Sequence, residues 1–222
     1  MPILRATEAR ILPGRRQQWL EVTRDLKKVV DKHGANLRVL ELAFGGAPGT
    51  VIISSMHDSW EAVAARHEAI NADKDFQALM ASAAKRPDFP FAEPVEVRLA
   101  ADITDEVGGG PAPLENAQVI QLMMMRVRPG KRAKQIDFIR QMREARKGAG
   151  EPVGSLMQIV AGDANVMSVV RGYANLAEWA KDRAAGESKA AADVARKAQA
   201  DSQYPFADLV AIRVLRDITQ QL

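Results

Sequence analysis

Three histidines are the side chains of this sequence that titrate nearest to neutral pH, and all three fall in its first half. His57 stands where an apolar run ends, and His67 follows in a segment with a helical pattern. An imidazole at the end of a strand can move a proton or orient a substrate. We therefore take His57 and His67 as candidate catalytic residues, although a polar residue that merely ends a strand would look the same.

Aromatic side chains near these positions are the candidate contacts for a ligand. They are Trp19, Trp60, Phe76, Tyr173 and Trp179. Large aromatic residues are also the usual filling of a hydrophobic core, so each has a structural interpretation beside the functional one. The third histidine, His33, ends an apolar helical stripe, where a core or capping role is the simplest expectation.

The sequence lacks the patterns of metal, phosphate and nucleophile sites. It contains no cysteine, so disulfides and thiolate ligands are excluded. His57 and His67 could share a metal, but their spacing dictates no third ligand. Neither a glycine-rich phosphate loop nor a nucleophile elbow is present. We expect no metal and no other cofactor.

The chain repeats itself. Segment 87–103 returns at 202–218, with Pro-Phe-Ala, one Arg and a final Asp-Ile at the same places. Upstream, Pro13-Gly14 aligns with Pro129-Gly130. A fixed offset of this kind predicts a tandem duplication. We expect a first repeat at 1–106, a linker rich in Gly and Pro at 107–115, and a second repeat at 116–222.

Each repeat has the pattern strand, helix, strand, strand, helix, strand. The expected strands are 3–12, 37–44, 50–56 and 95–99, then 119–127, 156–160, 166–171 and 209–215. The expected helices are 15–33 and 60–84 with a break near 71–73, then 131–147 and 175–199. This is the order of a ferredoxin-like unit, whose sheet has helices on one face. We predict an α+β fold of two tandem ferredoxin-like βαββαβ repeats that form an intrachain dimeric α/β-barrel.

These features resemble the dimeric α/β-barrel superfamily, as does the segment Asp58-Ser59-Trp60-Glu61-Ala62. Residues 71–79 resemble the second-helix region of NIPSNAP-like and antibiotic-monooxygenase-like members. The superfamily includes cofactor-free monooxygenases, haem-degrading enzymes, lactone isomerases and small proteins without a known activity. The resemblance therefore implies a fold and leaves the function open.

The haem-degrading members allow a comparison residue by residue. They carry an Asn in the first strand, where this sequence has Thr7 and Met123. They carry a Trp early in the second helix, which Trp179 matches, and a His later, where Lys189 stands. The first repeat has Val63 at the Trp position. Since the Asn and the His are both absent, the resemblance implies no haem for this chain.

Two functions remain open. The first is binding of a small hydrophobic molecule in a cleft between sheet and helices, without a defined activity. The second is a cofactor-independent monooxygenase or isomerase that acts on a small enolisable compound in the first repeat. There His57 would be the base or orienting group, His67 a second polar group, and Trp19, Trp60 and Phe76 the walls.

The expected surroundings and partners follow from composition and charge. No apolar run is long enough for a membrane helix, and no export signal precedes the first strand, so we expect a cytoplasmic protein without membrane contact. Basic residues share one helix face at Arg132, Arg140, Arg143 and Lys147. No aromatic residue interleaves with them, which favours a solvated face over a nucleic-acid site.

Assembly depends on two repeat-equivalent residues. Leu20 and Ile136 are expected outside the core-facing arc of their helices. An exposed aliphatic residue at the same place in both repeats indicates a shared contact, and we therefore expect a homodimer.

Overall fold

The computed structural model describes residues 1–110, 114 and 116–222, so part of the expected linker (111–113 and 115) lies outside the described residues. The described chain contains six α-helices, eight strands and two short 3-10 helices. It divides into two compact units. Unit 1 comprises Met1–Ala101 together with Arg216–Leu222, and unit 2 comprises Asp102–Leu215.

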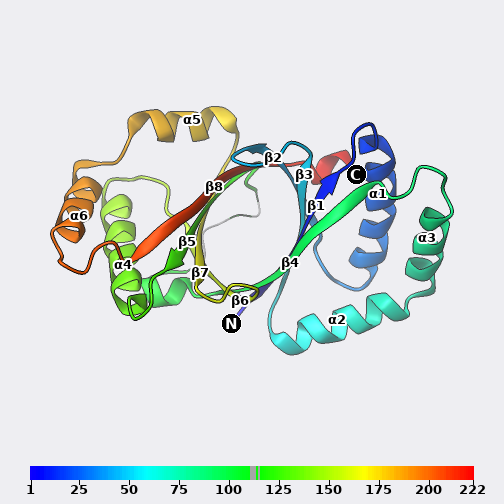
Figure 1. Cartoon of the computed structure of the whole chain (residues 1–222), viewed down its shortest axis with the longest axis horizontal. Coiled ribbons are helices and arrows are strands. Elements are labelled where there is room, and N and C mark those ends of the chain that lie inside the picture. The colour runs from blue at the N-terminus through cyan, green and yellow to red at the C-terminus, as the bar shows by residue number, and fades with distance from the viewer. Residues whose placement is uncertain (111–113, 115) are drawn as a thin grey trace. The chain divides into compact units, whose positions relative to one another are not determined.

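Unit 1 has a four-stranded antiparallel sheet in the order β2-β3-β1-β4. Its strands are β1 (Ile3–Ile11), β2 (Arg38–Phe44), β3 (Thr50–His57) and β4 (Ala92–Asp102). Its helices are α1 (Arg16–Lys32), α2 (Trp60–Ala72) and α3 (Lys74–Ala84), and they lie on one face of the sheet (Figure 1). The expected break of the second helix is confirmed, because Asp73 begins α3 as its N-cap.

Unit 2 has the same order of elements and the strand order β6-β7-β5-β8. Its strands are β5 (Val119–Val127), β6 (Ser155–Ala161), β7 (Val166–Tyr173) and β8 (Ala207–Asp217). Its helices are α4 (Arg132–Gly148), α5 (Leu176–Ala185) and α6 (Lys189–Gln199), again on one face of the sheet (Figure 1). No helix in the described ranges is both long and apolar enough to cross a membrane.

The single helix expected over 175–199 is wrong. The chain leaves α5 at Gly186, whose φ of 70° is accessible to glycine at little cost. Ser188 then caps the new helix α6, where its hydroxyl accepts a hydrogen bond from the backbone N–H of Ala191. A glycine followed by a serine cap separates the two helices.

Leu20 and Ile136 do not lie outside the core, which corrects the expectation above. They are 5% and 6% exposed, and Leu20 belongs to the core cluster of unit 1 beside Trp19 and Val30. Helix α1 turns the edge that carries Trp19, Leu20 and Thr23 towards the sheet, and leaves Val22 half-buried. Both side chains are already buried within the chain, so they give no argument for a homodimer.

Each unit is completed by a short segment at the end of the last strand of the other half of the chain. The segment Asp102-Ile103-Thr104 closes unit 2: the N–H of Ile103 donates to the carbonyl of Leu156 at 2.9 Å, and the N–H of Leu156 donates to Thr104 Oγ1 at 2.9 Å. The segment Asp217-Ile218-Thr219 closes unit 1 in the same way, with Val39 in the place of Leu156 and the same two distances. We call these the closing segments.

Candidate functional site

The pairing of β1 with β3 determines which side chains of unit 1 face the helices. Ile53 lies opposite Thr7 and packs against the core formed with α1. Side chains alternate between the faces of a strand, and residues paired across an antiparallel ladder share a face. Ser55 and His57 therefore face the helices, and so does Arg5, which is paired with Ser55.

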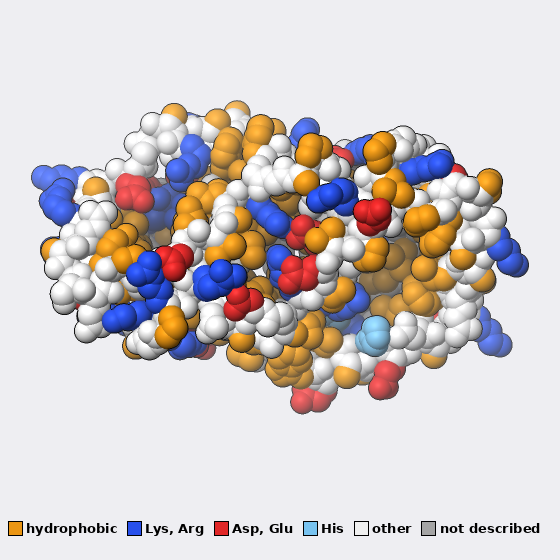
Figure 2. Space-filling view, viewed as in Figure 1, with side chains coloured by type: hydrophobic (Ala, Val, Ile, Leu, Met, Phe, Trp, Pro, Cys, Tyr) orange, Lys and Arg blue, Asp and Glu red, His pale blue; other side chains and the backbone are white. Residues whose placement is uncertain are grey.

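The middle of this helix-facing side is open to solvent. Arg5, Thr7 and Ser55 are only half-buried, although they lie on the two central strands of the sheet. On β4, Val97 lies opposite Thr7 and is 52% exposed. Figure 2 shows hydrophobic side chains gathered in a hollow between β4 and the helices of this unit. We call the place defined by Arg5, Thr7, Ser55, His57 and Val97 the unit 1 recess.

His57 forms the polar end of the recess and is 4% exposed. Its Nε2 lies 2.9 Å from Ser55 Oγ, and its Nδ1 lies 3.4 Å from Nη1 of Arg66 on α2. A guanidinium can only donate, so Nδ1 is the accepting nitrogen and Nε2–H donates to the serine. Burial lowers the pKa of His57, the charges of Arg66 and Arg5 lower it further, and Asp58 opposes them. The imidazole is therefore neutral at neutral pH.

Unit 2 carries a phenol where unit 1 carries this imidazole. Tyr173 ends β7 as His57 ends β3, and its hydroxyl donates to Asp182 Oδ2 on α5 at 2.8 Å. The other oxygen of Asp182 accepts from Nη2 of the buried Arg146 on α4 at 3.0 Å. Burial raises the pKa of Tyr173 to about 12, and the hydrogen bond to Asp182 contributes. The phenol stays protonated over the physiological range.

The polar end of the corresponding place in unit 2 is filled, whereas Ile212, at the place of Val97, is 39% exposed. The side chain of Gln121, at the place of Arg5, is buried and accepts a hydrogen bond from Nε1 of Trp179 at 2.8 Å. Tyr173 and Trp179 pack together with Val119 and Val214 in one hydrophobic cluster. Two of the predicted ligand contacts are thus brought together, in the core of unit 2.

The structure places the other candidates of unit 1 in surroundings different from those of His57. His67 is exposed on α2, with Nε2 3.0 Å from Asn71 Nδ2. Trp60 begins α2 with an exposed side chain, whereas Trp19 is buried in the core beneath α1. Phe76, in the first turn of α3, is half-buried.

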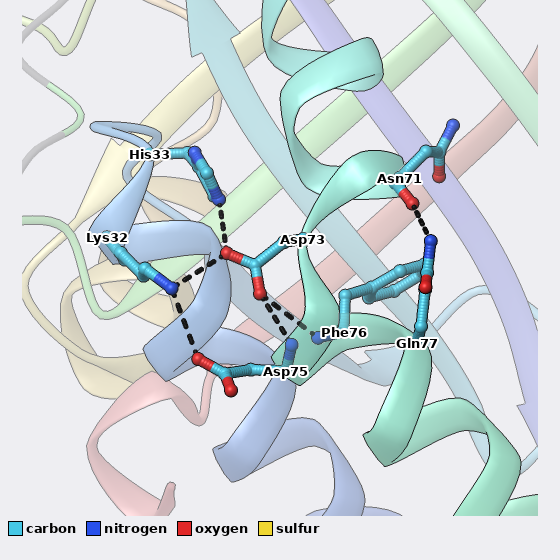
Figure 3. Close-up of polar contacts among 7 residues, drawn as sticks. All are labelled: Lys32, His33, Asn71, Asp73, Asp75, Phe76 and Gln77. Carbon is cyan, nitrogen blue, oxygen red and sulfur yellow. Dashed lines mark hydrogen bonds and ion pairs between the residues drawn. The ribbon is translucent and has the colours of Figure 1, made fainter.

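His33 belongs to a polar cluster that joins α1 to the start of α3 (Figure 3). Asp73 Oδ2 accepts from His33 Nε2 at 2.8 Å and from Lys32 Nζ at 2.9 Å. Its other oxygen accepts from the backbone N–H groups of Asp75 and Phe76, as an N-cap does. The hydrogen bonds from Lys32 and His33 hold the pKa of the Asp73 carboxyl well below its usual range. The cluster fixes the junction of α2 and α3.

Neither strand-end residue, His57 or Tyr173, is a suitable ligand for a haem iron. Unit 2 contains no histidine, and the hydroxyl of Tyr173 is kept protonated by its surroundings. In unit 1 both ring nitrogens of His57 already have partners. Within the described ranges, no group of three or more His, Cys, Asp or Glu side chains could hold a metal ion. The two strand-end residues do not fit a haem, and we derive no chemistry through one.

The basic face of α4 makes contacts inside unit 2. Arg132 pairs with Glu106 at 2.9 Å, Arg140 donates to the carbonyl of Glu106 at 2.8 Å, and Arg143 donates to the carbonyl of Gly110 at 2.8 Å.

Two grooves lie between helices, one of about 380 Å³ between α1 and α3 and one of about 260 Å³ between α4 and α6. Neither contains a histidine.

Sequence reasoning missed the partners of the two strand-end residues. Arg66 follows His57 at the same spacing at which Asp182 follows Tyr173, so the repeat alignment contains a signal for both contacts. Ser55 could have been found as well, since it lies two residues before His57 on the same face of a strand. Nothing in the sequence around Val97 indicates that its side chain is exposed.

No protein-family model matches the chain, and no curated protein matches its sequence. Solved structures match it over nearly its whole length. A candidate monooxygenase from Lactobacillus acidophilus NCFM has a TM-score of 0.57 and 8% identity, with 97% of this chain and 93% of that chain covered. A haem-binding protein from Thermus thermophilus has a TM-score of 0.56 and 8% identity, with 99% and 92% covered. A mutant chlorite dismutase from Candidatus Nitrospira defluvii has a TM-score of 0.55 and 7% identity, with 96% and 91% covered. At these identities the likeness concerns the fold alone, and the chain shares its α+β fold with the chlorite dismutase-like dimeric α/β-barrel proteins.

Proposed function

We propose that the chain binds a small hydrophobic molecule in the unit 1 recess. The observation that carries this proposal is Val97, an aliphatic side chain on the helix-facing side of a sheet that is nevertheless 52% exposed. Small-molecule sites are typically concave and apolar, with a few placed polar groups. The recess combines Val97 with the polar groups of Arg5, Ser55 and His57 at one end.

The proposal includes the origin of the chain. We infer a tandem duplication, with repeats at 1–106 and 116–222 joined by 107–115, related to NIPSNAP-like and antibiotic-monooxygenase-like proteins. The same order of elements in both units, the same strand order and the repeated Asp-Ile-Thr support a duplicated ferredoxin-like unit. The likeness to dimeric α/β-barrels over 97% of the chain supports two repeats in the places of two subunits. Unit 1 is then the binding half, because Gln121 and Trp179 fill the equivalent of its polar end in unit 2.

The direct test combines a search for bound compounds with a defined probe. Native mass spectrometry of the purified protein should detect a co-purified small molecule, and 1-octanol should bind by calorimetric titration. Val97→Asp should abolish octanol binding, because it places a charge in the apolar part of the recess. Met80→Asp is the matched control, since Met80 is an exposed apolar residue of α3. Equal octanol binding by both variants would disprove the assignment of the recess.

A second candidate function is a cofactor-independent monooxygenase or isomerase, and the state of His57 favours it. Its lowered pKa leaves a neutral imidazole able to take a proton from carbon and, in an isomerase, to return it to another atom. An enolisable hydrophobic ketone such as 2-tetralone would exchange its α-hydrogens for deuterium faster with the protein than without it. His57→Gln should lower that rate by about 10² or more. His67→Gln is the matched variant, and equal rates for the two would exclude His57 as the base.

A further inference from the structure

Arg5 and Arg66 are half-buried arginines of unit 1 without a carboxylate partner among the residues that the structure describes. Arg5 on β1 is half-buried and paired across the ladder with Ser55. Arg66 on α2 is also half-buried, and its Nη1 lies 3.4 Å from both the carbonyl of Met56 and Nδ1 of His57. A guanidinium withdrawn from water normally pairs with an anion, because the uncompensated charge is costly.

Arg38 and Arg98, which are also half-buried in this unit, follow that rule. Arg38 forms an ion pair with Asp217, and Arg98 with Glu8 and Glu96. Arg24, another half-buried arginine, donates to the carbonyls of Gln221 and Leu222 instead. Arg98 lies on the opposite face of the sheet from the recess, because it neighbours Val97 and Leu99 on an alternating strand. The recess thus contains two half-buried guanidinium groups without a carboxylate partner in the described part of the chain.

The charges of Arg5 and Arg66 act at the same end of the recess. Both lower the pKa of His57, which lies between the strand of one and the helix of the other. Asp58 is the acidic residue that opposes them; it is exposed, and no hydrogen bond or ion pair joins it to either arginine within the described part of the chain. This end is positive and can accept an anion.

Unit 2 has an acid at the equivalent place. Gln121 replaces Arg5, and Asp182 replaces Arg66 at the same distance along the chain from the strand end. The carboxylate of Asp182 meets the buried Arg146 and the hydroxyl of Tyr173. Unit 2 thus has a carboxylate at the position where unit 1 has a guanidinium.

We propose that the ligand of the unit 1 recess is a hydrophobic carboxylate, held at its charged end by Arg5 and Arg66 with its apolar body over Val97. The proposal deepens the binding function proposed above and rests on it. A guanidinium fork matches the two oxygens of a carboxylate. Ser55 assists, because Nε2–H of His57 donates to its oxygen and leaves its own hydrogen free to donate to the ligand.

Octanoate and 1-octanol separate the two proposals, because they share a chain length and differ in charge at pH 7. Calorimetric titration of the full chain should show octanoate at least about tenfold tighter than octanol, as expected for hydrogen bonds to a charged group. Arg5→Met and Arg66→Met should each remove this preference. Arg10→Met is the matched control, since Arg10 is an exposed arginine of the same strand outside the recess.

A measurement on the unaltered protein keeps the test independent of variant folding. Raising the salt from about 50 mM to about 500 mM should weaken octanoate binding severalfold and leave octanol binding unchanged. Octanol binding that is lost in Val97→Asp, with octanoate no tighter than octanol, would overturn this inference and leave the binding function intact. No binding of either probe would overturn both. A carboxylate preference that survives Arg5→Met and Arg66→Met would also overturn the inference.

Discussion

At the scale of single residues, the two units place oppositely charged side chains beside equivalent strand-end residues. A titratable group ends the third strand of each unit, and a residue in the second turn of the following helix contacts it: Arg66 beside His57, Asp182 beside Tyr173. Burial disfavours the charged form of both groups. The imidazole and the phenol are therefore both neutral at neutral pH, by a lowered pKa in one case and a raised pKa in the other.

The phenol gives a prediction for alkaline pH. In a Tyr204→Phe protein, Tyr173 is the remaining tyrosine, and its absorbance titration should have a midpoint near 12 instead of the ordinary value of about 10. A pKa raised in the folded state contributes stability below pH 10 that is lost as the pH rises towards 12. Asp182→Asn should lower the midpoint, because the carboxylate stabilises the protonated phenol. An unchanged midpoint near 10 in the folded Tyr204→Phe protein would contradict the buried hydrogen bond.

The sequence predicts the two strand-end residues but not the recess beside them. His57 and Tyr173 are found because both follow an apolar run at equivalent places. The alternation of Val95, Val97 and Leu99 indicates a strand with one apolar face, and such a face would ordinarily be buried. Whether Val97 is covered depends on where the helices cross the sheet, which no local pattern specifies.

At the scale of elements, local signals predict boundaries better than orientations. Ser59 and Asp73 are residues that favour the N-cap position, and both cap the helices that follow them. The helix expected over 175–199 fails because a run of alanines conceals the break at Gly186. The apolar pattern of α1 predicts a buried face centred on Val22, which leaves Leu20 outside it. In the structure the helix is rotated so that the adjacent residues Trp19 and Leu20 are both buried.

The closing segments give a prediction about stability. Thr104→Val keeps the shape but removes the acceptor for the buried N–H of Leu156, which should cost roughly 1–3 kcal/mol in the free energy of unfolding. Thr219→Val should cost less, because Thr219 is only half-buried and water can replace its hydroxyl. Urea unfolding measures both. Thr104→Ser retains the acceptor, and a Val variant as stable as this Ser control would show that the hydrogen bond contributes nothing.

At the scale of the whole molecule, unit 1 is not a continuous stretch of chain. Unit 1 contains Arg216–Leu222, and unit 2 begins at Asp102. Besides the contact through Val39, residues 216–222 bring Asp217 to Arg38, and Arg24 donates to the carbonyl of Leu222 at 2.8 Å. The repeat boundaries suggested by the sequence and the compact units of the structure therefore differ at their ends.

Separate fragments test whether each half of the chain needs the closing segment that the other half carries. Residues 1–110 and 116–222, expressed together with a tag on one of them, should co-purify, because each carries the closing segment of the other unit. A second fragment that ends at 215 lacks the segment 216–222 and should bind residues 1–110 more weakly. Affinity purification followed by size-exclusion chromatography measures both pairs. Two fragments that each fold alone, with no affinity for one another, would show that the exchange is dispensable.

The closing segments also determine the order in which the contacts of unit 1 form during synthesis on the ribosome. β4 can pair with β1 once the residues up to Asp102 have left the ribosome, but Asp217, Ile218 and Thr219 follow more than a hundred residues later. At 5–20 residues per second, unit 1 waits roughly ten seconds for its last contacts. Throughout that interval the backbone of Val39 lacks the partners that Ile218 and Thr219 later provide. A nascent first half is therefore the stage at which this chain is most exposed to pairing with another copy of itself.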